Sequence, residues 1–527
     1  MKRYSKYFDF HGPVFYPSAG LILLFIVLTL VIGDPMEQVF TNVQAWITEK
    51  TGWFFIITVN ILLGASFYFA FGKYGSLRLG GKNATPDFSI FSWFAMLFSA
   101  GMGIGLLFFS VAEPISNFMT PPVAPVDQAE RAHNALVYTY MHWGLHAWAI
   151  YAIIGLALAF FTFTRKLPLS IRSVFYPLMG NRIYGPFGDL IDVLSVIPTL
   201  FGLATSLGFG VQQIASGLNY LFDIPSTVTA QVLLITGITL AATTSVVLGL
   251  DKGVRVLSVF NIRIAMVFLL LMLFIGPTIF LFSSFIETTG GYIQNIISIG
   301  TWTGVFGEGD FQDVWTLVYW AWWISWSPFV GMFIARVSRG RTVREFVLGV
   351  LIVPTLLTFL WMSTFGGTAL FLELEGVGDV SAAVSEDIST ALFVMLKEFP
   401  LDAVTSFVGI VLVTGFFVTS SDSGSLVIDS ITSGGKLDAP VGQRIFWALA
   451  EGAVAATLLV GGGLAALQTA ALTTGLPFAV VLLIMCYSLY KGLDREYSRI
   501  KEDEVRKSKR SYEDTIKNFL KKNESES

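Results

Sequence analysis

Tryptophan is concentrated in two apolar stretches of this 527-residue chain, and rings gathered in this way can bind an organic cation. The first stretch, 142–151, holds Trp143, Trp148 and Tyr151. The second holds five tryptophans within twelve residues: Trp315, Trp320, Trp322, Trp323 and Trp326. A desolvated contact between a cation and an aromatic ring face contributes about 2 kcal/mol or more. Such a cluster suits a cation that cannot donate hydrogen bonds, for example a trimethylammonium group.

An interfacial belt is the alternative explanation, because tryptophan is also enriched where a membrane meets water. Trp322, Trp323 and Trp326, however, fall near the centre of their apolar stretch. At 1.5 Å per helical residue, that centre is roughly 15 Å from either edge. The depth favours a binding site.

Alternating glycines suggest that backbone carbonyls could bind an ion. Gly101, Gly103 and Gly105 interrupt another apolar stretch, and each glycine costs a helix about 1 kcal/mol relative to alanine. The segment could therefore unwind and direct carbonyls at an ion or ligand. Close packing of two helices is the competing explanation.

Hydroxyl groups in the segment Thr419-Ser420-Ser421-Asp422-Ser423 could form an ion site together with such unwound backbone carbonyls. Thr419 and Ser420 could supply the hard oxygens that sodium prefers, or could instead bond back to their own helix. Other carboxylates in the apolar stretches are expected to be few, at Asp192 and Glu451. That scarcity favours sodium over protons.

Enzyme chemistry is not indicated. The four histidines, His11, His133, His142 and His146, are not accompanied by clustered acidic residues, so we expect neither a metal centre nor an acid–base pair. His142 and His146 are one helical turn apart and could bind a metal, but packing is the simpler explanation. The single Cys486 excludes an intrachain disulfide.

The elements that carry these residues are membrane-spanning helices. The chain is 54% hydrophobic and 13% charged, against about 25% charged in an ordinary soluble domain. A spanning helix needs about 20 apolar residues. About twelve such stretches are present: 14–33, 52–71, 89–111, 135–163, 189–219, 227–249, 262–285, 311–336, 346–371, 402–430, 444–466 and 468–490.

Charge between the stretches predicts the orientation. Lys and Arg precede the first stretch and follow the second, fourth, sixth, eighth and twelfth, whereas the intervening loops are acidic. The positive-inside rule then places both termini in the cytoplasm. We expect the chain in the inner (plasma) membrane. The first stretch lacks a small-residue cleavage site and is interpreted as a spanning helix, not a signal peptide.

Two blocks of five predicted helices suggest an internal repeat. We expect a cytoplasmic N-terminus (1–13), two peripheral helices (14–88), a first block (89–285), an amphipathic interfacial linker (286–310), a second block (311–490) and a cytoplasmic tail (491–527). Because five is odd, the repeat must be inverted, which predicts an all-α, LeuT-like membrane fold. The tail is either a solvated helix or a regulatory helix that contacts lipid or another subunit.

Three segments together resemble the betaine/choline/carnitine transporter family over residues 14–490. They are GMGIGLLFFSVAEP at 101–114, HWGLHAWAIY at 142–151 and YWAWWISWSPFVGMFIARVSRGRTVREF at 319–346. The resemblance implies twelve helices around two inverted repeats, assembled as a homotrimer.

The resemblance also implies roles for single residues. Trp143, Trp148, Tyr151 and Trp323 would surround the quaternary ammonium group, with Trp322 and Trp326 along the same pathway. Met102, Gly103 and Gly105 would contribute unwound backbone, and Gly105 would leave room for the carboxylate of betaine where proton-driven choline carriers tend to have Asp. The 108–114 segment, by contrast, is similar to choline carriers.

The implied sodium site combines carbonyls of Ser99, Met102 and Phe416 with the hydroxyls of Thr419 and Ser420. Thr199 fits a second sodium site, although Leu203 stands where some relatives have a hydroxyl.

The expected function is sodium-coupled import of glycine betaine for osmoprotection. Proton- or sodium-coupled transport of choline, ectoine, carnitine or a dimethylsulfonio compound is the alternative, and an ion channel is the alternative from a different class. We expect membrane lipid around the protein, no nucleic-acid partner, and no cofactor besides sodium as coupling ion.

Overall fold

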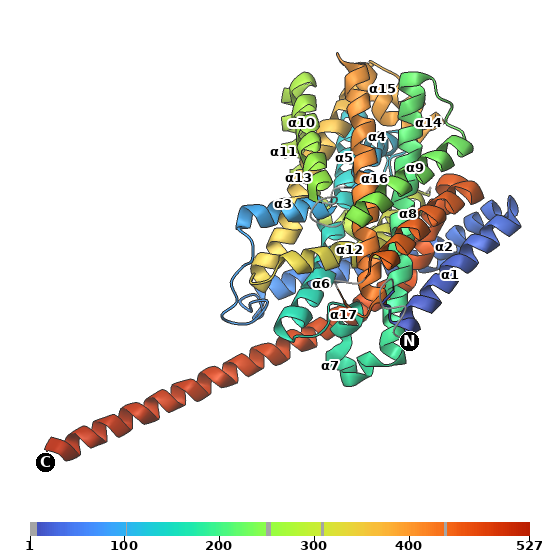
Figure 1. Ribbon diagram of the computed structural model, residues 1–527. Coiled ribbons are helices and arrows are strands. Elements are labelled where there is room, and N and C mark those ends of the chain that lie inside the picture. Colours follow the sequence, from blue (N-terminus) through green and yellow to red (C-terminus); the bar gives the residue numbers. More distant parts are fainter. Residues whose placement is uncertain (1–7, 102, 249–254, 307–309, 437–439, 527) are drawn as a thin grey trace.

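The protein is a bundle of helices from which one long helix projects (Figure 1). The computed structural model describes residues 8–101, 103–248, 255–306, 310–436 and 440–526. Within those ranges all regular structure is helical, apart from a single backbone bridge between Arg78 and Thr342. Ten of the described helices are long and apolar enough to cross a membrane. The all-α membrane fold expected from composition is confirmed.

The helices follow the apolar stretches closely. In chain order they are α1 (Gly12–Ile32), α2 (Pro35–Phe71), α3 (Ile90–Gly101), α4 (Ile104–Met119), α5 (Gln128–Trp143), α6 (Leu145–Ala159), α7 (Tyr176–Met179), α8 (Pro186–Phe222), α9 (Val228–Leu248), α10 (Arg255–Ile275), α11 (Thr278–Gly300), α12 (Leu317–Val337), α13 (Val343–Glu375), α14 (Val380–Glu386), α15 (Ala391–Lys397), α16 (Asp402–Thr432) and α17 (Val441–Glu526). A π-helical turn, Phe160–Thr164, extends α6, and another, Gln312–Thr316, leads into α12.

Several predicted spans differ from the observed helices. The third, 89–111, is divided into α3 and α4, and the eleventh and twelfth lie in α17, which bends where Gly462 and Gly463 have non-helical backbone angles. The seventh, 262–285, corresponds to the candidate span Val256–Ile275, but its C-terminal bound is wrong, because α10 ends at Ile275 and α11 begins after Pro277. Proline has no N–H group to continue the helical hydrogen-bond ladder. The inverted repeat and the number twelve stay predictions.

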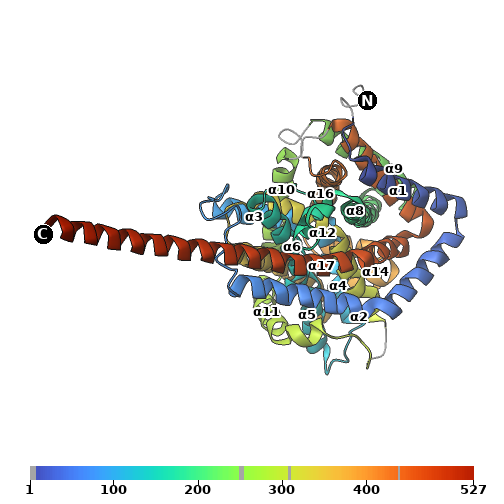
Figure 2. The same ribbon diagram turned by 90° about the horizontal axis from the view of Figure 1, so that it is seen from below.

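Helix α12 lies at the centre of the bundle and packs against α6, α8 and α17. In its most apolar 18-residue stretch, 94% of the residues are buried within the protein, whereas the corresponding share is 28% for α1 and α9. Viewed from below, α6 and α12 lie inside the bundle, and α1 and α2 lie at its edge (Figure 2). The tryptophan-rich helix is therefore enclosed by other helices.

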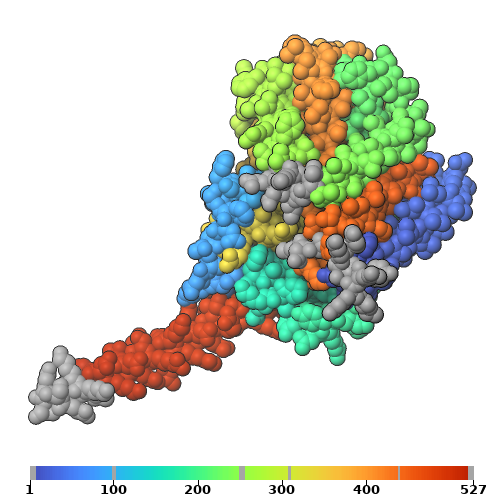
Figure 3. Space-filling view, in the orientation of Figure 1, coloured from blue at the N-terminus to red at the C-terminus, as the bar shows by residue number. Residues whose placement is uncertain are grey.

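The chain enters and leaves the bundle at the same end. The start of α1, α7 and the point where α17 leaves the bundle are together at the lower end in Figure 1. An ion pair between Lys73 and Asp494 (2.7 Å) joins the end of α2 to α17 at this level. A further ion pair, between Lys82 and Glu504 (3.1 Å), lies farther along α17, and beyond it the tail stands clear of the bundle (Figure 3). Its apolar side chains are exposed, including Val505 (67%) and Tyr512 (70%).

Candidate functional site

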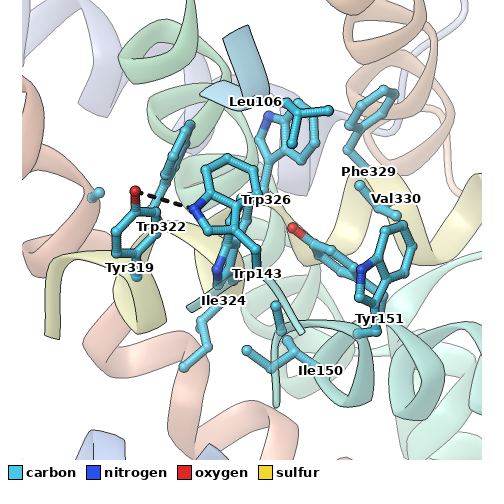
Figure 4. Packing of buried hydrophobic residues seen from close by; sticks show 14 of the residues in the cluster. Leu106, Trp143, Ile150, Tyr151, Tyr319, Trp322, Ile324, Trp326, Phe329 and Val330 are labelled. Carbon is cyan, nitrogen blue, oxygen red and sulfur yellow. Dashed lines mark hydrogen bonds between the residues drawn. The ribbon is translucent and has the colours of Figure 1, made fainter. Parts of the chain in front are cut away.

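The predicted aromatic residues come together from two directions inside the bundle (Figure 4). Trp143 is the last residue of α5, and a break at Gly144 (φ −98°, ψ −143°) precedes α6, which carries Trp148 and Tyr151. Helix α12 carries the other three aromatic residues. We call this set the aromatic cluster: Trp143, Trp148, Tyr151, Trp322, Trp323 and Trp326. Each member is at most 5% exposed, so the cluster is not a belt at a membrane interface.

Trp323 is the centre of the aromatic cluster. Its ring centroid is 4.8 Å from that of Trp322, with the planes nearly parallel, and 4.9 Å from that of Trp143, edge to face. The ring of Tyr151 lies 6.2 Å from Trp323 and 5.5 Å from Trp148. Ring faces in a dry interior attract a cation more strongly than they would in water. The arrangement can therefore hold an onium group.

Two buried polar atoms of the aromatic cluster lack hydrogen-bond partners among the described residues. They are the hydroxyl of Tyr151 and Nε1 of Trp326, both buried. A buried polar group without a partner costs about 1–3 kcal/mol. Both are hydrogen-bond donors, so an acceptor such as a carboxylate on a bound ligand would satisfy them.

A carboxylate that sequence reasoning missed supports the aromatic cluster. Glu113 of α4 is fully buried, and its Oε2 accepts a hydrogen bond from Nε1 of Trp143 at 2.8 Å. Its Oε1 lies 2.6 Å from Nδ1 of His142, and the hydroxyl of Tyr319 donates to its Oε2. A carboxylate two positions after the predicted stretch 89–111 was the available signal. The sequence did not show that α4 packs against the aromatic rings.

Buried carboxylates are more numerous than expected. The described residues include six that are at most 3% exposed: Glu113, Asp192, Asp422, Asp429, Glu451 and Glu496. The prediction of scarcity was therefore wrong, because other segments of the fold supply these carboxylates with polar partners. Asp192, for example, binds the hydroxyl of Ser170 at 2.8 Å and the guanidinium of Arg172.

The helix breaks at the glycine motif. Helix α3 ends at Gly101, and Gly103 is extended (φ −147°, ψ −173°) before α4 begins. Met102 lies outside the described residues, and so does the side chain of Ser99 in the last turn of α3. The predicted roles of their carbonyls stay predictions.

The two described glycines bring α4 close to α12. A Cβ atom at Gly103 would lie 3.1 Å from Cη2 of Trp326, and one at Gly105 would overlap Cη2 of Trp322. The space beside Gly105 is thus occupied by an indole ring. This differs from the expectation that Gly105 leaves room for a carboxylate.

The predicted sodium ligands on α16 are adjacent. The Thr419 hydroxyl is 3.2 Å from the carbonyl oxygen of Phe416 and 3.0 Å from that of Gly415, and Ser420 is buried beside it. Thr419 thus bonds back to its own helix, which was the alternative explanation. Its oxygen also faces Nδ2 of Asn261 at 3.5 Å.

Helix α4 begins close to α16. A Cβ atom at Gly210 of α8 would lie 2.9 Å from Ile104, the first residue of α4, and 3.3 Å from Val413 of α16. The glycine break and the hydroxyl-bearing helix therefore approach the same face of α8. A hard cation between unwound carbonyls and hydroxyls would fit the chemistry of this region.

The second predicted sodium ligand, Thr199, is buried in α8, and its hydroxyl bonds to the carbonyl of Ser195 at 2.6 Å. Leu203, one turn later, packs tightly against Gly424 of α16. His142 is occupied by Glu113 and by Thr316 (2.9 Å from Nε2). In the described ranges no group of three or more His, Cys, Asp or Glu side chains could hold a metal ion.

Comparison with known proteins gives consistent matches along the chain. The sequence model of the betaine/carnitine/choline family of transporters (BCCT) matches residues 13–498. Glycine betaine transporter 1 of Vibrio parahaemolyticus is 50% identical over 497 residues, covering 93% of this chain and 95% of that protein. A glycine betaine/proline/choline/ectoine transporter of the same species is 49% identical over 500 residues, covering 93% and 88%.

Among solved structures, a manganese transporter mutant from Eremococcus coleocola is similar over 77% of this chain and 83% of its own, with 16% identity and a TM-score of 0.43. That likeness is too weak to support a conclusion. The family match, in contrast, includes the aromatic cluster, the helix break and the hydroxyls of α16. The chain belongs to the betaine/carnitine/choline transporter family and is a betaine/choline-type transporter, not an enzyme.

Proposed function

We propose that this transporter imports glycine betaine together with sodium, for osmoprotection. The observation that carries the proposal is the burial of the aromatic cluster around Trp323. The trimethylammonium group of betaine would contact the ring faces. Its carboxylate would accept hydrogen bonds from donors such as Tyr151 and Trp326, which have no partner among the described residues.

The competing substrates share the onium group but not the carboxylate. Choline carries a hydroxyl in its place and would leave the Tyr151 and Trp326 donors with a weaker, uncharged acceptor. One relative at 49% identity is described as transporting glycine betaine, proline, choline and ectoine. Broad specificity for compatible solutes is therefore the nearest alternative to betaine alone.

Sodium is the proposed coupling ion because two predicted ligands, the Phe416 carbonyl and the Thr419 hydroxyl, are neighbours on α16. The helix break preceding Ile104 would add backbone carbonyls on the opposite side. Proton coupling is the competing arrangement, favoured by buried carboxylates such as Glu113 and Glu451.

We propose the inner membrane as the location, with both termini in the cytoplasm and three copies of the chain in one assembly. Support for the orientation comes from the shared end of the bundle where the N-terminal segment, α7 and the departing α17 lie (Figure 1). The basic residues Arg172 and Arg182 lie next to α7 at that end. Support for the trimer is the family resemblance.

Uptake into proteoliposomes tests the proposal. Labelled betaine, choline and ectoine are compared under an inward sodium gradient, an inward proton gradient and no gradient. We expect saturable betaine uptake driven by sodium. Uptake driven by a proton gradient alone would show that the coupling ion is the proton and not sodium. Uptake of choline in preference to betaine would show that choline is the substrate.

A further inference from the structure

Glu113 connects three helices at the aromatic cluster. It belongs to α4, whereas Trp143 and His142 end α5 and Tyr319 lies in α12. Its Oε2 accepts hydrogen bonds from Nε1 of Trp143 at 2.8 Å and from the Tyr319 hydroxyl, and its Oε1 lies 2.6 Å from Nδ1 of His142. All four residues are at most 4% exposed.

The same network reaches the central ring of the aromatic cluster. Nε1 of Trp323 donates to the backbone carbonyl of His142 at 2.9 Å. The imidazole of His142 is held from its other side by the hydroxyl of Thr316, 2.9 Å from Nε2. Trp143 and Trp323, whose rings meet edge to face at 4.9 Å, are therefore both anchored next to Glu113.

Hydrogen bonds to a carboxylate are stronger and more directional than bonds between neutral groups. In a buried network they also fix the rotamers of the side chains that donate. An indole can turn about its side-chain torsions unless packing or its N–H group restrains it. The Nε1 donor of Trp143 is restrained by Glu113, and also lies 3.3 Å from the Tyr319 hydroxyl.

We propose that Glu113 is a positioning residue for substrate binding: it holds Trp143 and Tyr319 in the orientation that lets the aromatic cluster accept an onium group. The inference rests on the proposed function. Glu113 acts through its geometry as a hydrogen-bond acceptor and not as a counter-charge to the substrate.

Two substitutions separate geometry from charge. In Glu113→Gln the amide oxygen can still accept from Trp143 and Tyr319, and the amide N–H can donate to Nδ1 of His142 once the imidazole proton sits on Nε2. Glu113→Leu removes the carboxylate acceptor from three buried side chains, of which Trp143 keeps only the longer bond to the Tyr319 hydroxyl at 3.3 Å. If the carboxylate acted by its charge, both variants would be equally impaired.

The test measures binding of labelled betaine to the purified full-length protein at equilibrium. We expect Glu113→Leu to raise the Kd about tenfold or more, the effect of losing one ring contact, while Glu113→Gln stays within about threefold of wild type. The number of binding sites per folded protein should not change. A merely structural role would lower that number and leave the Kd of the remaining sites unaltered, which would overturn the inference.

A double-mutant cycle checks that Glu113 acts through Trp143. In a Trp143→Phe background the indole N–H is absent, so Glu113→Leu should change the Kd by less than it does in wild type. Full additivity of the two changes would contradict the proposed route. Glu496→Leu is the matched control, because it removes a buried carboxylate (3% exposed) of α17 that pairs instead with Arg165 and Arg499.

Near-ultraviolet circular dichroism without substrate keeps the inference separate from the proposed function. Closely spaced indoles, such as the stacked pair Trp322 and Trp323, give signals that depend on their mutual orientation. We expect the spectrum to change in Glu113→Leu and to be restored in Glu113→Gln. Wild-type protein that binds no betaine would refute the proposed substrate, whereas an unchanged spectrum in Glu113→Leu would refute the positioning role.

Discussion

Helices α12 and α1 differ in hydropathy and in burial, and in opposite directions. Helix α12 is the least apolar of the ten candidate spans and 94% of its most apolar stretch is buried, whereas α1 is among the most apolar and only 28% of its stretch is buried. In water the relation would be reversed, since apolar residues would be the ones inside. In a bilayer the outer surface contacts hydrocarbon, so polar groups gather inside, where they find partners.

The difference teaches where function resides in this protein. Tryptophan N–H groups, hydroxyls and carboxylates on inner helices bond to each other, as Trp322 does with Ser206 at 3.1 Å. On α1 the large side chains face outward, with Leu23 53% and Val31 78% exposed. Comparable substitutions should therefore affect transport or stability more on the inner helices than at the rim, by which we mean the outer helices α1, α2 and α9.

The largest expected effect concerns the coupling ion. Thr419→Ala combined with Ser420→Ala on α16 should abolish the stimulation of betaine uptake by a sodium gradient, because both predicted side-chain ligands are lost. The matched change at the rim is Thr243→Ala with Thr244→Ala on α9, where both hydroxyls bond only to their own helix. Uptake into proteoliposomes, with and without the gradient, checks this. Retained stimulation in the α16 variant would remove Thr419 and Ser420 from the sodium site.

The second-largest effect is expected at Trp323, the centre of the aromatic cluster. Trp323→Leu should weaken the apparent affinity for betaine about tenfold or more while membrane insertion is normal, since a desolvated ring contact contributes about 2 kcal/mol. Trp53→Leu on α2 is the control, because that indole is 62% exposed at the rim. The apparent affinity of each variant is measured from the dependence of uptake on betaine concentration. Equal affinities for the two variants would exclude the aromatic cluster as the substrate site.

A smaller effect, on the stability of the protein, is expected from overpacking. Gly105→Ala would push its methyl group into Trp322, a neighbour of the central ring, and should destabilise the protein by about 1–3 kcal/mol. Gly20→Ala on α1 adds a methyl group with no atom within 4 Å and should be neutral or slightly stabilising. Thermal unfolding of the purified variants compares them. Similar midpoints would mean that Trp322 can move aside.

The smallest effect is predicted for the tail. Ending the chain after Lys501 removes side chains that are exposed, such as Tyr512 and Phe519 (64%), so betaine affinity should be unchanged. Uptake measured before and after an osmotic upshift then decides between a solvated and a regulatory helix. Loss of activation with unaltered affinity would identify the tail as regulatory.

Local patterns predicted much of the fold and of the site. Apolar stretches of about 20 residues identified the spanning helices, since a bilayer accepts little else. The alternating glycines indicated the break between Gly101 and Ile104, and the tryptophan spacing identified α12. The breaks at Gly144 and Pro277 were missed, because one glycine or proline in an apolar run interrupts some helices and is accommodated in others, as Pro328 is in α12.

By itself, the sequence determined that this is a helical membrane protein with rings and hydroxyls placed deep in apolar segments, because hydrophobicity and residue type are local properties. Only the tertiary structure decided which of these groups meet. Glu113 and Tyr319 are 206 positions apart, and Trp323 is 181 positions from the carbonyl that binds its N–H. Contacts between such distant helices depend on how whole helices pack, which no local pattern encodes.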